Sequence, residues 1–116
     1  MSRDSQTIPP AEALSLLALI TTTEGGIASR VLAKTTGGNV TLFAFDRGQG
    51  LEEHTSPFDA LVLVLEGALV LTIGGGAVRA LPGSVVRMPA GVPHALDAPE
   101  ESTRMLLIML REVQAT

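Results

Sequence analysis

The sequence contains no cysteine, no tryptophan and no tyrosine, and phenylalanine, with three residues, is the only one of the large aromatic types present. Without cysteine the chain has no disulfide, no thiolate metal site and no cysteine nucleophile. Because these aromatics make up only 3% of the residues, stacking on single-stranded nucleic acid is not expected to be the main function. The formal net charge is −4, and lysine and arginine do not cluster. The charge pattern therefore argues against binding to nucleic-acid phosphates.

Long hydrophobic runs are also missing. The one candidate targeting segment, Ala13 to Ile20, is too short to span a bilayer and has no basic flank. We therefore expect a soluble cytoplasmic protein that makes no contact with a membrane. A chain of 116 residues is long enough for one domain with a real core and too short for two. Since 46% of the residues are hydrophobic, that core is expected to consist of Leu, Val, Ile and Ala.

Short apolar segments separated by turns rich in Gly, Pro and Asn predict eight to ten strands and an all-β barrel or jelly roll. Besides a strand that carries His54, the expected strands are residues 27–34, 40–46, 61–65, 68–73, 77–81, 84–88, 94–98 and 103–110. Residues 11–20 follow two prolines and favour a short helix, with an extended arm as the alternative. The predicted layout is a tail and helix or arm at 1–26, a barrel at 27–112 and a polar tail at 113–116.

The only two histidines lie in two glycine-bounded segments with regular spacing. The first segment runs from Gly48 through His54 to Gly67, and the second runs from Gly83 through Pro89 and Gly91 to His94. These segments resemble the two motifs of small single-domain cupins, G-x5-H-x-H-x3-E-x6-G and G-x5-P-x-G-x2-H-x3-N. The resemblance implies a cupin barrel in which His54 and His94 face a common interior.

Three positions depart from the cupin pattern: Ser56 replaces the second histidine, Ala60 the glutamate and Ala98 the asparagine. In metal-bearing cupins the three histidines and the glutamate form the metal site, so only His54 and His94 carry over. The resemblance implies at most one divalent transition metal (Zn, Ni, Fe or Cu), weakly held because no carboxylate offsets its charge. The alternative is a polar pocket with hydrogen-bonded histidines and no metal.

Other side chains are candidates for the same pocket. If the strand is regular, its period of two places Ser56, Phe58 and Ala60 on the face of His54, and we take Ser56, Phe58 and Met88 as candidate ligand-binding residues. Asp59 would point inward only if Pro57 forces a bulge. Three methionines (Met88, Met105 and Met109) offer soft thioethers, although filling gaps in a core is their commoner role. No catalytic triad can be assembled around Ser56.

The segment Leu61 to Leu65 is apolar on both faces, which is typical of a sheet covered on both sides. In a small barrel the second layer is most economically another subunit, so we predict a homodimer packed sheet on sheet. The preferred function is binding of a metal ion or a small polar ligand at His54 and His94. Two alternatives remain: a metal-dependent enzyme of the oxygenase, isomerase or lyase class, and a structural dimer whose pocket has no function.

Overall fold

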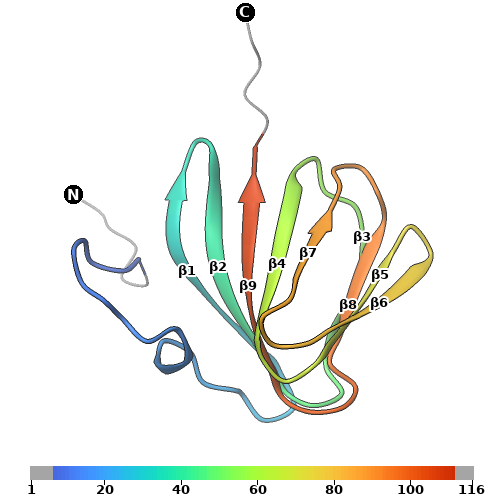
Figure 1. The fold of residues 1–116 in the computed structure, drawn as a ribbon, viewed down its shortest axis with the longest axis horizontal. Helices are drawn as coiled ribbons and strands as arrows, with labels where there is room; N and C mark the ends of the chain where they lie inside the picture. The colour runs from blue at the N-terminus through green and yellow to red at the C-terminus, as the bar shows by residue number, and fades with distance from the viewer. Residues whose placement is uncertain (1–6, 112–116) are drawn as a thin grey trace, which may run out of the picture.

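The computed structural model describes residues 7–111 and confirms the all-β prediction (Figure 1). Within these residues there are nine strands and one short 3-10 helix, η1. The elements are η1 (Leu16–Ala18), β1 (Ile27–Thr35), β2 (Gly38–Phe45), β3 (Gly50–His54), β4 (Asp59–Glu66), β5 (Leu69–Ile73), β6 (Gly76–Ala80), β7 (Val85–Met88), β8 (His94–Asp97) and β9 (Thr103–Leu110). Every strand expected from the sequence is present, with ends that differ by a few residues.

The strands form two antiparallel sheets that face each other in a jelly-roll arrangement (Figure 1). One sheet has five strands in the order β1-β2-β9-β4-β7, and the other has four in the order β3-β8-β5-β6. His54 of the first motif ends β3 and His94 of the second motif begins β8, and these two strands are neighbours. The topology therefore brings together two segments that are forty residues apart.

Strand β4 is apolar on both faces, as predicted. Its residues alternate in burial: Ala60, Val62 and Val64 are buried in the core between the sheets, while the leucines between them lie on the outer face and are partly exposed. The chain's own N-terminal segment covers part of that outer face. Ile20 is buried there in a second cluster, to which Leu65 contributes.

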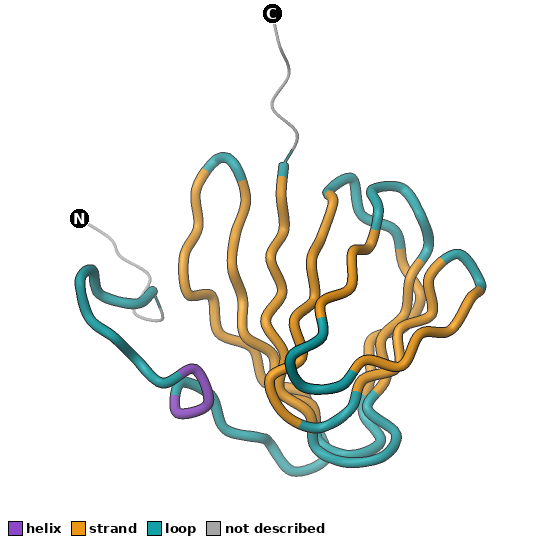
Figure 2. The backbone as a smooth tube through the Cα atoms, in the orientation of Figure 1, coloured by secondary structure: helices purple, strands orange, loops and turns teal. Residues whose placement is uncertain are grey.

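The helix expected over residues 11–20 is reduced to the single turn of η1 (Figure 2). The rest of the segment follows an irregular path along β1, and the amide of Ile8 donates to the carbonyl of Leu32. Two arginines of the five-stranded sheet hold this segment by its carbonyl oxygens: Arg30 donates to Leu19 and Arg104 to Leu17. Contacts with the sheet thus override the helix preference of this alanine- and leucine-rich sequence.

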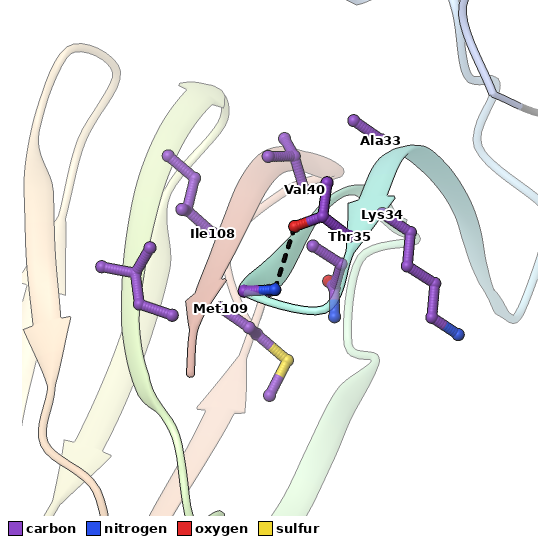
Figure 3. A pocket seen from close by; sticks show the side chains of 10 residues that line it. Ala33, Lys34, Thr35, Val40, Ile108 and Met109 are labelled. Carbon is purple, nitrogen blue, oxygen red and sulfur yellow. Dashed lines mark hydrogen bonds between the residues drawn. The ribbon is translucent and has the colours of Figure 1, made fainter. Parts of the chain in front are cut away.

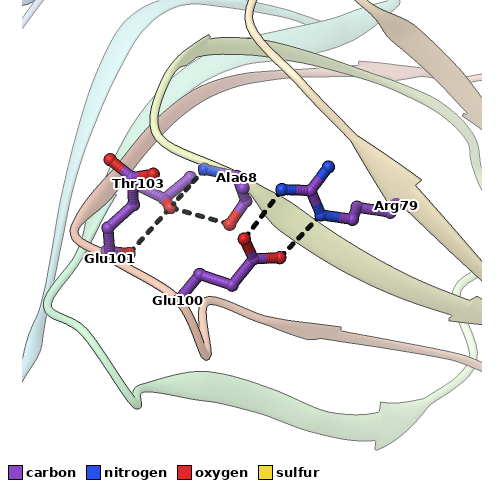
Figure 4. A network of polar contacts seen from close by, with 5 residues as sticks. All are labelled: Ala68, Arg79, Glu100, Glu101 and Thr103. Carbon is purple, nitrogen blue, oxygen red and sulfur yellow. Dashed lines mark hydrogen bonds and ion pairs between the residues drawn. The ribbon is translucent and has the colours of Figure 1, made fainter.

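Polar contacts join the two sheets at one end (Figure 4). The hydroxyl of Thr103, at the start of β9, is completely buried and lies within hydrogen-bond distance of both the amide and the carbonyl of Ala68, just before β5. Nearby, Arg79 forms a two-pronged ion pair with Glu100, with N–O distances of 2.6 and 2.7 Å. That pairing raises the pKa of Arg79 and lowers the pKa of Glu100.

The strands extend from Ile27 to Leu110, whereas the predicted C-terminal tail at 113–116 and the first six residues lie outside the described part of the chain. In that described part, no helix has the length and apolar character needed to cross a bilayer.

Candidate functional site

An irregularity in β3 sets the direction of the first imidazole. Leu51 lies opposite Leu96, and a regular antiparallel register would then place Glu53 opposite His94. The observed partner of His94 is instead His54, because one extra residue enters β3 between Leu51 and His54. Such a bulge reverses the alternation of side chains beyond it. As a result Leu51 and His54 both line the same cavity.

The two imidazoles meet edge to face. Their Nε2 atoms are 3.2 Å apart, and their ring planes are inclined at 71°. Each Nδ1 lies beside the carbonyl oxygen two residues earlier in the chain, at 2.9 Å from Glu52 for His54 and at 3.1 Å from Val92 for His94. Because a carbonyl oxygen only accepts, each Nδ1 carries a hydrogen and donates it. In the neutral rings both Nε2 lone pairs therefore point into the space between them.

The loop that delivers His94 is fixed by backbone hydrogen bonds on both sides. Gly91 donates to the carbonyl of Ser56 at 2.8 Å, and Gly74 donates to the carbonyl of Pro93 at 2.9 Å. Gly91 has φ +76°, a conformation that favours glycine. The second imidazole thus stands on a restrained support rather than on a free loop.

Asp59 belongs to this support and not to the site. Its carboxylate accepts the amide hydrogen of Ala90 at 2.8 Å and a hydrogen bond from Arg87 at 2.9 Å. These two donors, with Ala90 the stronger influence, hold the pKa of Asp59 below its usual value. Asp59 does not line the cavity of the two histidines. The inward swing considered for it therefore does not occur.

A cavity of about 140 Å³ lies between the two sheets at the imidazoles. His94 is 4% exposed, whereas His54 is exposed and stands at the mouth. Apart from the histidines and Ser56, the lining is apolar and consists of Phe43, Leu51, Ala60, Met88, Leu96, Met105, Leu107 and Met109. Drug-sized ligands occupy about 300 to 1,000 Å³, so the cavity fits a metal ion, a few waters or a very small molecule.

The structure brings Ser56 and Met88 to the two histidines but leaves Phe58 outside. The regular alternation expected through Phe58 is wrong, because residues 55–58 lie between β3 and β4 and are not a strand. Phe58 instead packs under the guanidinium of Arg111, which is 5.2 Å from the ring centre. The hydroxyl of Ser56 accepts the amide hydrogen of Phe58, which leaves its own hydrogen available to a ligand.

Sequence reasoning named Ala60 and the three methionines as candidates for the pocket, but it did not identify the rest of the apolar lining: Phe43, Leu51, Leu96 and Leu107. The alternation of residues 103–110 places Met105, Leu107 and Met109 on one face, and this signal was available. Leu51 had no such signal, because its orientation relative to His54 depends on the bulge.

Only two of the four metal ligands of the cupin pattern, His54 and His94, are present in this chain. Two metal–nitrogen bonds of about 2.0 Å with nitrogens 3.2 Å apart enclose an angle of roughly 105°, so the imidazoles fit two adjacent positions of one ion. Ala60 lines the cavity where the pattern has its carboxylate. Over residues 7–111, no group of three or more His, Asp and Glu side chains comes together in a way that would hold a metal. The site offers two neutral nitrogens and no compensating negative charge.

A larger hollow of about 280 Å³ lies elsewhere, where the turn between β1 and β2 meets the end of β9 (Figure 3). Its walls include Ala33, Val40 and Ile108, and Lys34 is its one charged residue. The hydroxyl of Thr35 accepts the amide hydrogen of Gly37 and is occupied by the turn itself. This hollow has no convergent polar groups, so we place the candidate site at the two histidines.

Comparison with known proteins identifies the class that this fold and site define. The family described as cupin domain matches residues 41–110, which contain both histidine motifs. No curated protein matches the chain.

Solved structures give the same answer. A conserved protein of unknown function from Streptococcus pyogenes is 34% identical, with a TM-score of 0.87 and 98% of each chain covered. A cupin superfamily protein from Desulfitobacterium hafniense is 30% identical, with a TM-score of 0.83, 96% of this chain and all 100% of that one covered. A cupin 2 conserved barrel domain protein from Leptotrichia buccalis is 33% identical, with a TM-score of 0.82, over 84% of this chain and 47% of that one. The chain therefore belongs to the cupin family.

Proposed function

We propose that this cupin binds a metal ion or a small polar ligand in the cavity at His54 and His94. One observation carries the proposal: two Nε2 atoms lie 3.2 Å apart while both Nδ1 atoms donate to backbone carbonyls. Two neutral imidazoles in this arrangement place lone pairs against each other, which is unfavourable unless a proton shared in an Nε2–Nε2 hydrogen bond, or another acceptor of electron pairs, stands between them. A metal ion, or a hydrogen-bond donor of a ligand, meets that need.

Ser56 and the size of the cavity narrow the ligand class. The serine hydroxyl can donate to an anionic or carbonyl oxygen, and the space of about 140 Å³ admits only a few non-hydrogen atoms. Small carboxylates and similar polar molecules fit this description, whereas sugars and nucleotides do not. Catalysis has weaker support, because Ala60 replaces the carboxylate that would hold and tune a catalytic metal.

The binding proposal is tested by metal analysis and by ligand screening. Protein purified without an affinity tag is titrated with transition metals, and its thermal stability is measured against a panel of small carboxylates and amines. We expect saturable binding that raises the melting temperature in the manner of mass action. Replacing both histidines by alanine should abolish it. A flat response to every metal and ligand, or binding that survives the double substitution, would refute the proposal.

We also propose that two copies of the chain associate through the outer face of the five-stranded sheet. The N-terminal segment covers only one part of that face. On this face Val85, directly opposite the outward-facing Leu63, is 58% exposed, and Leu110, at the end of β9, is 48% exposed. A second copy is the occupant that matches this apolar surface without requiring any other component. A cytoplasmic location remains a prediction.

The oligomeric state tests this association. We expect sedimentation velocity to give a dimer for the native chain and a monomer for Leu63→Arg, which places a charge beside the exposed Val85. Val78→Arg is the matched control, because Val78 is equally apolar and 43% exposed but lies on β6 of the other sheet. A native chain that sediments as a monomer at all concentrations would contradict the proposal.

A further inference from the structure

The cavity combines two imidazoles with three thioethers, and the thioethers come from the sheet opposite the histidines. Met88 lies on β7, and Met105 and Met109 lie on β9; all three line the cavity with His54 and His94. These are three of the four methionines in the chain. Met88 is 3% exposed and Met105 is fully buried. Met88 and Met105 are thus held in a dry environment beside the buried His94, whereas Met109 is partly exposed and also lines the hollow of Figure 3.

The strand register places two of these methionines beside the missing carboxylate. In the five-stranded sheet, Ala60 on β4 lies directly opposite Met88 on β7 and directly opposite Met109 on β9. The three residues form one row across three strands, with side chains on the same face of the sheet. The small methyl group of Ala60 leaves space between the two longer side chains. At the position where the cupin pattern has a hard oxygen ligand, this chain has two soft sulfur donors as neighbours.

The donor set favours one kind of ion. Every candidate donor is neutral, so no side chain offsets the charge of a bound ion in this apolar cavity. A monovalent ion brings half the uncompensated charge of a divalent ion and is therefore less costly to bury. Thioether ligands select Cu(I), whereas Zn, Ni and Fe prefer sets with more nitrogen, thiolate or carboxylate. The N–metal–N angle of roughly 105° excludes linear coordination by the two imidazoles in these positions. The remaining coordination positions of the ion are therefore open to sulfur.

We propose that the cavity is selective for Cu(I), bound by Nε2 of His54 and His94 together with thioether sulfur from Met88 and Met109. This inference rests on the proposed metal binding at the two histidines and specifies the ion and the remaining ligands. Met105, which lies opposite Val64 further along the strands, stands behind this pair as part of the cavity wall. His54 at the mouth is the contact point for an incoming ion, and His94 with Met88 forms the buried end.

The test measures Cu(I) affinity without oxygen, on the full chain without a tag, by competition with a coloured Cu(I) chelator. We expect one equivalent of Cu(I), bound more tightly than Zn(II), and sulfur next to copper in the X-ray absorption spectrum. Met88→Leu and Met109→Leu, which preserve volume, should each lower the Cu(I) affinity by at least about tenfold, because loss of a direct ligand costs no less than the roughly tenfold to hundredfold lost with a residue that only supports a ligand. Zn(II) affinity should be unchanged.

Leu107→Ile is the matched control, because Leu107 lines the same cavity without offering a donor; its Cu(I) affinity should equal that of the native chain. Copper with nitrogen and oxygen neighbours only, or Met→Leu variants with native Cu(I) affinity, would overturn this inference and leave metal binding at the histidines intact. Cu(I) binding that survives replacement of both histidines would overturn both proposals. Absence of any metal binding would also overturn the inference, while the small-ligand form of the proposed function would still be open to the thermal screen.

Discussion

Replacing Gly50 by alanine would separate β3 from β8 at the base of the strand that carries His54. Gly50 lies opposite Asp97, and an added Cβ would lie 2.4 Å from the carbonyl oxygen of Leu96 and 2.3 Å from the carboxylate of Asp97. The carboxylate can rotate away, but the backbone oxygen cannot. Since ordinary contacts of this kind begin at 3.4 Å, the two strands must move apart by about 1 Å, a strain of the overpacking kind.

This displacement has two measurable effects. Overpacking of this kind lowers the free energy of unfolding by about 1 to 3 kcal/mol. Metal and ligand sites tolerate only about 0.5 Å of displacement, so binding at His54 and His94 should weaken at the same time. Because the chain has no tryptophan or tyrosine, urea denaturation followed by far-UV circular dichroism is the suitable stability assay.

Gly26→Ala provides the control. Its added Cβ would meet nothing closer than 3.5 Å, and its backbone is not left-handed, so its stability should be unchanged or about 0.4 to 1 kcal/mol higher. If Gly50→Ala and Gly26→Ala gave the same unfolding midpoint and the same metal affinity, the close approach of β3 to β8 would be disproved.

Three further outcomes follow from single contacts. The amide of Ala90 and the guanidinium of Arg87 lower the pKa of Asp59. The ionised Asp59 carboxylate therefore stabilises the fold above the usual carboxyl pKa of about 3.9, and this stabilisation is lost as the pH falls through the lowered pKa of the folded state. The melting temperatures of the native chain and Asp59→Asn should differ at pH 7 and converge at low pH. Phe58→Leu should leave metal and ligand affinity unchanged in the titrations above, because Phe58 does not line the cavity. Thr103→Val leaves buried backbone groups without their side-chain partner and should lower the unfolding free energy by about 1 to 3 kcal/mol in urea denaturation.

Local patterns were enough to locate the strands and the candidate ligands. The alternation of apolar residues and the positions of glycine and proline predicted the strands, and the resemblance to the two cupin motifs implied that His54 and His94 share an interior. Phe58 shows the limit of this reasoning. A period of two was carried through residues 55–58, where the chain is not a strand, so Phe58 lies under Arg111 instead of in the cavity.

The N-terminal segment shows the same limit for helices. Its composition favours a helix, but the preference of each residue is only a fraction of a kilocalorie per mole. Hydrogen bonds from Arg30 and Arg104 to the segment's carbonyl oxygens, and burial of Ile20 against the sheet, compete with that preference. Both arginines are distant in sequence from the carbonyls that they bind, so no local pattern contains this information.

By itself the sequence determined which chemical groups this protein possesses: two imidazoles, no thiol, and alanine where a carboxylate ligand would stand. The tertiary structure alone decided how they are arranged. The extra residue in β3 turns His54 toward His94, and the row from Met88 through Ala60 to Met109 spans three strands. Register and bulges arise from pairing between distant strands, where a shift of one residue moves a side chain to the other face. The identity of the donors is therefore local information, and their convergence is not.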